Sequence, residues 1–237
     1  MINDKLNEAE KEIALTFPND TTSKDYLLLS ASLSWKRGNY LTASNYYKRA
    51  MPLDSARSSN GMAILHSINK EYKAAISHVN TAIRLDPKTD DYFITRANIY
   101  YALSNYDNAR ADYSRALKLD SLSDHAYYNL GLTYYALSDY RKSKENLTHA
   151  ISIRPNMKAY FERGIACYYL KDYRSAITDF QKSLKYIKNM NYYEEMSKGS
   201  VYYYIGWSYH YLGKNSKYKK YIRKAERNGW KGEVEGT

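Results

Sequence analysis

Small residues recur along this chain at an interval close to 34 residues. A second column of Ala or Ser lies seven residues upstream of the first five members of that column, and a tyrosine lies three residues before each of its members. A fixed period of this length is typical of stacked helical repeats, in which each repeat packs mainly on its neighbours. The period therefore predicts one elongated array of helix pairs. The first column consists of Ala50, Ala82, Ala116, Ala150, Ser183 and Ala225, with spacings of 32, 34, 34, 33 and 42 residues.

The fourth repeat shows most clearly how each repeat is built. Tyr127, Leu130, Gly131 and Tyr134 follow the three-or-four spacing of one helix face. Because Gly131 has no Cβ, we expect a neighbouring helix to approach closely there. The other repeats carry Ala31, Ala63, Ala97, Gly164 and Gly206 at this place.

Turn residues separate helix A of each repeat from helix B. Gly38 and Gly213 can adopt the left-handed conformation that ends helix A. Helix B is expected to end just before Pro87 or Pro155 in the second and fourth repeats. Side-chain caps at the start of helix B are expected from Asn39, Asn105, Asp139 and Asp172.

These columns resemble the tetratricopeptide repeat, whose 34-residue signature places aromatic, Leu-Gly, Tyr, Ala and Pro residues at fixed offsets. The fourth repeat departs from that signature at Ser143 and Leu147, and the second matches least well, with His66 in a tyrosine column. The resemblance implies an all-α fold, a right-handed α-solenoid superhelix of antiparallel helix pairs. The matching residues of the fourth repeat are Tyr127, Leu130, Gly131, Tyr134, Ala150 and Pro155.

The resemblance covers roughly residues 24–228. Residues 1–18 are expected to form an N-terminal capping helix, or the trailing helix of a missing repeat, and residues 229–237 a tail. An insertion of about eight residues within 186–197 is expected to lengthen helix B of the fifth repeat. The six repeats are placed near residues 24–55, 56–89, 90–123, 124–156, 157–190 and 199–228.

In this family four positions of helix A line a concave groove, so the resemblance implies where a partner would bind. These positions are rich in Tyr and Trp, which offer large contact area at low ordering cost. We therefore expect a non-catalytic scaffold that binds a protein or peptide segment. The groove residues are expected to be Trp35, Asn98, Tyr101, Tyr128, Asn129, Tyr135, Lys158, Phe161, Tyr168, Tyr203 and Trp207, with Leu28, Asn60, Ile64, Ile94, Leu132 and Ile165 at further groove positions.

Many of the 29 tyrosines would be needed for packing whether or not anything binds. Tyr101, Tyr128, Tyr135 and Tyr168 lie just off the core stripe and are expected on the binding face. Replacing Tyr135 and Tyr168 with alanine should then weaken partner binding and leave stability within about 1 kcal/mol. Core packing is expected instead for Tyr40, Tyr72, Tyr100, Tyr106, Tyr134, Tyr140 and Tyr173.

Some members of the family hold a C-terminal carboxylate with five clamp residues. Asn98, Asn129 and Lys158 match three of the clamp positions, whereas Ile94 and Glu162 stand where a lysine and an arginine belong. A carboxylate would meet little positive charge and one repelling group. An apolar or aromatic extended segment fits this groove better.

Two other kinds of ligand remain as alternatives. A glycan or small ligand could stack on the same aromatic residues of the groove. Clustered cations near the C-terminus could bind a polyanion, with a solvated capping helix as the simpler interpretation and nucleic acid disfavoured. The candidate patch consists of Lys217, Lys220, Arg223, Lys224 and Arg227, within a stretch from 214 to 231 that has eight basic residues and one acidic residue.

The sequence contains no pattern that indicates an enzyme, a cofactor or a metal site. The five histidines are spread over three repeats without metal-ligand spacing. Cys167 lies in a tyrosine column and is expected to fill the core. No apolar stretch approaches the roughly 18 residues of a membrane span. Acidic residues near the N-terminus do not fit a signal peptide, so we expect a cytoplasmic location, or a periplasmic or secreted one if a signal was removed.

Overall fold

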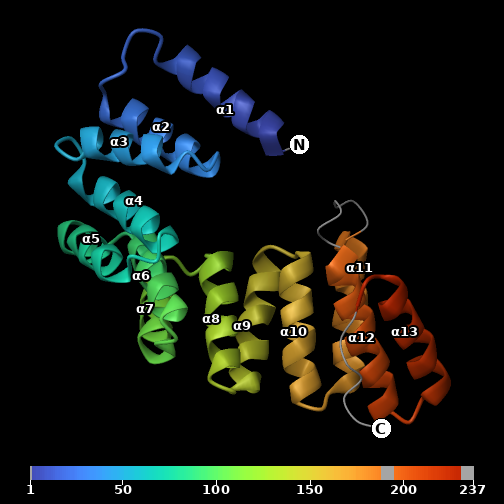
Figure 1. Cartoon of the computed structure of the whole chain (residues 1–237). Helices are drawn as coiled ribbons and strands as arrows, with labels where there is room; N and C mark the ends of the chain where they lie inside the picture. Colours follow the sequence, from blue (N-terminus) through green and yellow to red (C-terminus); the bar gives the residue numbers. More distant parts are fainter. Residues whose placement is uncertain (1, 188–194, 231–237) are drawn as a thin grey trace. The chain divides into compact units, whose positions relative to one another are not determined.

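The computed structural model describes residues 2–187 and 195–230, and within these ranges the chain is entirely α-helical apart from its turns (Figure 1). The predicted all-α helical repeat fold is confirmed. The chain divides into an N-terminal body, residues 1–121, and a C-terminal body, residues 122–237, which are described separately. No described helix is long and apolar enough to cross a bilayer.

The helices follow the predicted alternation of helix A and helix B, each A packing most closely on its own B. Helix α1 (Ile2–Thr16) precedes the pairs and packs on α2. Residues 188–194 of the expected insertion lie outside the described residues, and α12 starts before residue 199. The pairs are α2 (Lys24–Lys36) with α3 (Tyr40–Ala50), α4 (Ser55–Ile68) with α5 (Tyr72–Leu85), α6 (Asp90–Ala102) with α7 (Tyr106–Leu119), α8 (Asp124–Ala136) with α9 (Tyr140–Ile153), α10 (Met157–Tyr169) with α11 (Tyr173–Ile187), and α12 (Glu195–Tyr211) with α13 (Asn215–Arg227).

The turn between helix A and helix B has the same backbone form in all six pairs. In the third pair the Ser104 N–H bonds to the Tyr101 carbonyl and the Asn105 N–H to the Tyr100 carbonyl, the two bonds of a Schellman end. Asn105, Asp139 and Asp172 then cap helix B as predicted, whereas the side chain of Asn39 makes no capping bond. The left-handed residues of the turns are Gly38, Lys70, Ser104, Ser138, Lys171 and Gly213.

The column of small residues in helix A lets helix B approach closely, as predicted. A Cβ placed on Gly131 would lie 2.7 Å from Cγ of Leu147 in helix B of the same pair. Gly164 faces Phe180 at the same distance. The absence of a side chain at these positions therefore sets how closely the two helices of a pair pack.

The core follows the other predicted columns. Ala43, Ala75, Ala109 and Ala176 are fully buried, and so is Cys167. Burial raises the pKa of the Cys167 thiol to about 11, so the thiol stays protonated and inert at neutral pH. Tyr40 is an exception, because it was expected in the core and is 42% exposed. It is the first residue of α3 and lies at the edge of its pair.

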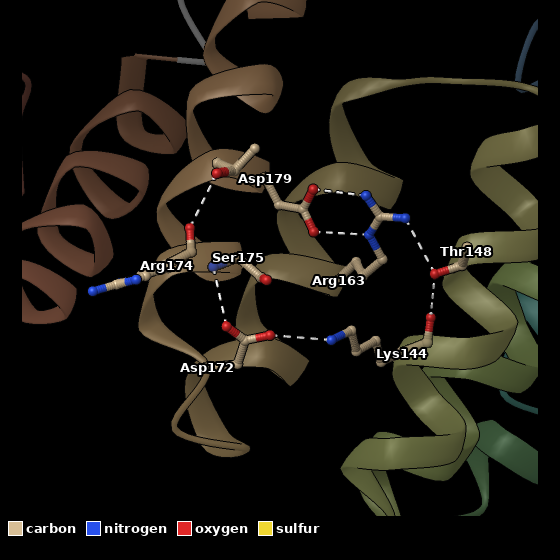
Figure 2. A network of polar contacts seen from close by, with 8 residues as sticks. Lys144, Thr148, Arg163, Asp172, Arg174, Ser175 and Asp179 are labelled. Carbon is tan, nitrogen blue, oxygen red and sulfur yellow. Dashed lines mark hydrogen bonds and ion pairs between the residues drawn. The ribbon is translucent and has the colours of Figure 1, made fainter.

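Two arginines on helix A join three helices each. Arg163 of α10 makes two 2.7 Å bonds to Asp179 of α11 and a 3.1 Å bond to Thr148 of α9 (Figure 2). Arg96 of α6 bonds in the same way to Asp112 of α7, at 2.7 and 2.8 Å, and to Asn80 of α5. Each arginine thus fixes its own pair against the preceding helix B.

Helix α13 differs from the earlier B helices on the face that would receive a following repeat. Its twelfth residue is Glu226. Its fifth is Lys219, where α5 and α11 have isoleucine, although α7 and α9 are also basic there, with Arg110 and Lys144. Charged side chains at both places give α13 a solvated face. The twelfth residue of the other B helices from α5 to α11 is Ile83, Leu117, Ile151 or Leu184.

Candidate functional site

Three of the predicted groove residues surround Tyr204 in the C-terminal body, and a fourth adjoins them. The Tyr204 ring lies 6.0 Å from Phe161, 5.5 Å from Tyr168 and 5.4 Å from Tyr203, measured between ring centroids. Trp207 continues the contact from Tyr203 at 6.1 Å. Helices α10 and α12 carry these rings, so the close packing of consecutive A helices makes the surface continuous.

Tyr135 joins the same surface through the end of α10. Its ring lies 5.7 Å from Tyr169, which in turn lies 5.8 Å from Tyr168. Tyr211, at the end of α12, is 54% exposed and contacts both Tyr168 and Trp207. We name this group the aromatic surface: Tyr135, Phe161, Tyr168, Tyr169, Tyr203, Tyr204, Trp207 and Tyr211.

Three members of the aromatic surface were missed by the sequence reasoning. Tyr169 directly follows the predicted Tyr168, Tyr204 directly follows the predicted Tyr203, and Tyr211 lies four residues after the predicted Trp207. The signal was present, because both A helices end in consecutive aromatic residues where the third and fourth pairs have alanine. These three rings connect groove residues that are separate when only four positions of each A helix are considered.

One expectation about exposure was wrong, and another is modified by packing. Ile165 was placed in the groove, but it is 5% exposed and belongs to the core cluster with Phe180 and Ile205. Tyr135 and Tyr168 are half-buried and pack against that cluster, and burial raises the pKa of both phenols. Replacing them with alanine would therefore also cost packing energy in the core.

Trp207 has a polar atom that its surroundings leave unsatisfied. Its indole Nε1 is buried and has no hydrogen-bond partner within the part of the chain that the structure describes. The ring is surrounded by other aromatic side chains, including His210 and Tyr218 at 5.1 and 5.4 Å. A buried donor of this kind costs free energy until an acceptor reaches it.

A hollow of about 400 Å³ adjoins the first A helices of the C-terminal body. It contains three predicted groove residues, Tyr128, Asn129 and Lys158, of which only Lys158 is exposed. Arg154 lines it as well, and its guanidinium bonds to both oxygens of Asp124 at 2.7 and 2.8 Å. Because that pair neutralises itself, Lys158 gives the hollow its positive character.

Glu162 lies one helical turn beyond Lys158. Burial raises the pKa of its carboxyl to about 7, and the nearby Lys158 ammonium partly offsets that effect. The carboxyl has no partner among the described residues. At neutral pH the Glu162 carboxyl is therefore partly protonated. It does not supply the positive charge that the arginine of a carboxylate clamp has at this position.

The predicted groove residues of the N-terminal body do not join into a surface of rings. Trp35 packs against the core cluster around Tyr47. Asn98 is exposed, and its side-chain oxygen accepts a hydrogen bond from the Tyr113 hydroxyl. Tyr101 contacts Tyr106 at 5.4 Å. These three residues form no continuous ring surface like that of the C-terminal body.

A second hollow, of about 460 Å³, lies in the N-terminal body between α2, α4 and the start of α6. It contains the predicted groove positions Leu28, Asn60 and Ile64. The side-chain oxygen of Asn60 is buried and has no hydrogen-bond partner among the residues described. Asp86 and Asp91 bring carboxylates to its rim.

The predicted cationic patch forms one face of α13. Lys220, Arg223 and Arg227 are spaced three and four residues apart, so they lie along one exposed line of the helix. Lys217 and Lys224 flank the line and lie over the rings of Tyr209 and Tyr221 at 5.1 and 5.2 Å. None of these five cations pairs with a carboxylate in the described segments. In the same segments, no three potential metal ligands cluster.

Three family models match the middle of the sequence. A TPR repeat model matches residues 97–138, and two tetratricopeptide repeat models match residues 124–157 and 157–189. No curated protein sequence matches the chain.

Solved structures extend the similarity to nearly the whole chain. PilF of Pseudomonas aeruginosa has a TM-score of 0.73 at 16% identity, covering 86% of this chain and 90% of its own. The anaphase-promoting-complex hetero-tetramer Cut9–Hcn1 has a TM-score of 0.73 at 18% identity, covering 96% and 43%. A tetratricopeptide repeat protein of Parabacteroides merdae has a TM-score of 0.59 at 18% identity, covering 97% and 89%. Residues 97–189 thus consist of tetratricopeptide repeats, and the solved structures show the fold of tetratricopeptide repeat proteins over most of the chain.

Proposed function

We propose that this protein is a non-catalytic scaffold whose aromatic surface binds an extended segment of another protein. The observation that carries the proposal is the continuity of eight half-exposed or exposed rings across α8, α10 and α12. Tyrosine and tryptophan are rigid side chains that bury large areas when a partner covers them. Such rings are common in binding hot spots.

The hydrogen-bonding state of Trp207 supports the same proposal. Its buried Nε1 donor has no acceptor among the described residues. An extended segment carries a backbone carbonyl at every residue, so it can supply that acceptor. Binding would then remove a polar penalty from the free protein in addition to burying the rings.

Proteins with repeats of this type generally mediate protein–protein interactions, and the structurally similar Cut9–Hcn1 is a hetero-tetramer. For this chain the partner's chemistry is inferred from the surface. Phenol and indole rings favour aliphatic and aromatic side chains, with main-chain hydrogen bonds to polar edges.

A peptide display selection against the immobilised protein tests the proposal. We expect an apolar or aromatic consensus whose binding is weakened at least about 10-fold by Tyr211→Ala and by Trp207→Phe, which removes the donor and keeps most of the ring volume. Tyr186→Ala is the matched control, because Tyr186 is 43% exposed and stacks on Tyr160 outside the aromatic surface. Saturable binding of glycans with no peptide consensus would overturn the proposal in favour of a carbohydrate site.

A second candidate function is binding of a polyanion by α13. The row formed by Lys220, Arg223 and Arg227 is exposed and lacks carboxylate partners among the described residues. Such a row attracts phosphate or sulfate groups, and its affinity falls steeply with salt.

Retention on a heparin column tests this candidate. It should be lost between 50 and about 200 mM salt, and the variant Lys220→Gln/Arg223→Gln/Arg227→Gln should elute earlier than wild type. The control Arg141→Gln/Lys142→Gln/Lys171→Gln removes equal charge from exposed sites elsewhere in the C-terminal body. Equal elution of the two variants would reject a site on α13.

A further inference from the structure

Two clusters of three tyrosines, alike in their arrangement, lie along the aromatic surface. In each cluster the twelfth residue of a helix A contacts the first residue of the following helix B and the last residue of the next helix A. The first residues of α9 and α11 thus extend the aromatic surface toward the turns. We name the clusters the tyrosine triads: Tyr135, Tyr140 and Tyr169 form the first, and Tyr168, Tyr173 and Tyr211 form the second.

The two triads have nearly the same geometry. Tyr140 stacks on Tyr169 with ring centroids 4.9 Å apart and an interplanar angle of 17°, and Tyr173 stacks on Tyr211 at 4.9 Å and 12°. In each triad the twelfth residue of helix A lies 5.5 to 5.9 Å from both stacked rings. A ligand that lies along the surface would therefore meet the same set of contacts twice, one helix pair apart.

The rings of the triads are held in place before any ligand binds. Burial raises the pKa of both Tyr135 and Tyr168, and a hydrogen bond to Tyr169 or Tyr211 raises it further. Tyr169 and Tyr211 are 44% and 54% exposed, so they are the members that a ligand can reach most easily. Rings that are already fixed lose little conformational freedom when a partner covers them.

We propose that the tyrosine triads bind a proline-rich segment in the polyproline II conformation, with one proline on each triad. The inference rests on the proposed scaffold function and names the class of segment that the aromatic surface recognises. Segments of this conformation dock on surfaces lined by aromatic side chains, and they lose little entropy because they are ordered before binding.

The spacing of the triads fits the pitch of polyproline II. Helices α8, α10 and α12 contact one another in turn, and the axes of packed helices lie about 8–10 Å apart. Polyproline II rises about 3.1 Å per residue with three residues per turn, so every third side chain returns to the same face after about 9 Å. The corresponding repeat is about 7 Å in a strand and about 5 Å in an α-helix. Polyproline II therefore presents equivalent residues to both triads.

The turns beside the triads carry positive charge that specifies what flanks the prolines. Asp139 and Asp172 lie in two of these turns, but they pair with Lys142 and Lys144 at 3.2 Å, the second pair being drawn in Figure 2. Four further cations are exposed and form no ion pair among the described residues, so acidic residues next to the prolines would be complementary in charge. These cations are Arg141, Lys171, Arg174 and Lys214.

Trp207 offers a hydrogen bond at the second triad. Its ring lies 6.1 Å from that of Tyr211, and its buried Nε1 has no acceptor among the described residues. The carbonyl groups of polyproline II form no hydrogen bonds within the segment, so one of them can accept from this indole. An α-helical ligand has most of its carbonyl groups already engaged.

Calorimetric titration of the full chain with synthetic peptides tests the inference. Each peptide has two aspartates followed by nine residues, which are all proline, or alanine with three prolines at three-residue or at two-residue spacing. We expect saturable binding of the all-proline peptide, and an affinity at least about 3-fold higher for the three-residue than for the two-residue spacing. Absence of binding to the all-proline peptide, or equal affinities for the two spacings, would overturn the inference.

Substitutions in the triads provide a matched comparison. Tyr169→Ala and Tyr211→Ala should each weaken binding of the all-proline peptide at least about 5-fold. Tyr186→Ala should leave the affinity unchanged, because Tyr186 has a similar exposure of 43% and lies outside the triads. Equal losses in all three variants would contradict a site on the triads.

A charge reversal tests the flanking contacts without changing a ring. Wild type should bind the all-proline peptide with two aspartates more tightly than the same peptide with two lysines. The variant Lys171→Glu/Arg174→Glu should reverse that preference, because both residues are exposed beside the second triad. A preference that does not change in this variant would contradict the predicted acidic flank.

The outcome separates this inference from the scaffold proposal. If peptide display selects a consensus without proline and its binding still needs the aromatic surface, the scaffold stands and the proline-rich assignment fails. If glycans bind saturably while neither the display nor the proline peptides give binding, both fail.

Discussion

Individual buried polar groups distinguish this chain from a plain stack of helices. Small residues, left-handed glycines and the core cysteine could be assigned from the repeat columns, because each position needs one physical property. The ionisation of Glu162 could not, since it depends on how many atoms neighbouring helices place around one carboxyl. Lys70, Ser104, Ser138 and Lys171 also take left-handed conformations that their residue types did not indicate.

Glu162 should make stability depend on pH. Burial raises the pKa of its carboxyl from 4.5, the ordinary value for a glutamate, to about 7, so the folded state binds the proton more tightly than the unfolded state. The free energy of unfolding should therefore fall as pH rises from about 4.5 to about 7. Glu162→Gln should flatten that fall and stabilise the protein at pH 8 by about 1–3 kcal/mol.

Urea unfolding between pH 4 and 8, followed by circular dichroism, measures this effect. Glu145→Gln is the control, because Glu145 is an exposed residue of the same body. If the free energy of unfolding changes with pH equally in Glu162→Gln and in wild type, the buried carboxyl is not the cause of that pH dependence.

Gly131→Ala should destabilise the protein although alanine favours helices. The added methyl would lie 2.7 Å from Cγ of Leu147, a fully buried side chain with no free end to turn away. We expect a net loss of about 1–3 kcal/mol in thermal unfolding. Combining it with Leu147→Val should recover part of the loss, and a double variant no more stable than Gly131→Ala would argue against a steric cause.

At the scale of helices and turns, the sequence predicted the alternation of A and B but not the polar ties between them. The caps at Asn105, Asp139 and Asp172 are local, so they could be recognised from neighbouring residues. The bonds from Arg96 and Arg163 span 16 residues, to Asp112 and Asp179, and reach the preceding helix as well. The spacing of residues within one helix does not show which side chain of another helix will lie opposite, so these bonds could not be predicted.

Replacing Arg163 alone should lower the free energy of unfolding more than replacing both Arg163 and Asp179. Arg163 and Asp179 have side-chain exposures of 16% and 6%, so Arg163→Met leaves a buried carboxylate without its partner. We expect a loss of about 3–5 kcal/mol, reduced in the double variant Arg163→Met/Asp179→Leu. Urea unfolding provides both values.

Arg154→Met serves as the comparison, because Arg154 is 58% exposed in its pair with Asp124 and should cost less than about 1 kcal/mol. Equal losses for Arg154→Met and Arg163→Met would show that burial does not set the contribution of these pairs.

At the scale of the whole molecule, the predicted groove is distributed unevenly. The C-terminal body joins its aromatic residues into one surface, whereas Trp35, Asn98 and Tyr101 in the N-terminal body form no such surface of rings. Counting positions along helix A predicted the same groove in every repeat. It could not predict which positions become connected, because that depends on rings such as Tyr204 outside the counted columns.

Helix α1 should be the least protected of the helices. Most of its residues are exposed, and it packs chiefly on α2, whereas inner helices pack on their own pair and on a neighbouring pair. Local opening is easiest where few apolar contacts are lost. Hydrogen exchange followed by mass spectrometry should show the fastest amide exchange in α1 and slow exchange in α8 and α9. Protection of α1 equal to that of α8 would contradict this gradient.

The charged residues at the fifth and twelfth places of α13 have a consequence for protein engineering. Glu226 stands where the B helices from α5 to α11 carry an aliphatic residue, and Lys219 stands where α5 and α11 carry isoleucine. A copy of an inner repeat fused after α13 would meet charged side chains instead of an apolar surface. Its first helix would not pack there, and the added repeat would stay unfolded. Lengthening this protein therefore requires an insertion between inner repeats, or first changing those two side chains to isoleucine and leucine.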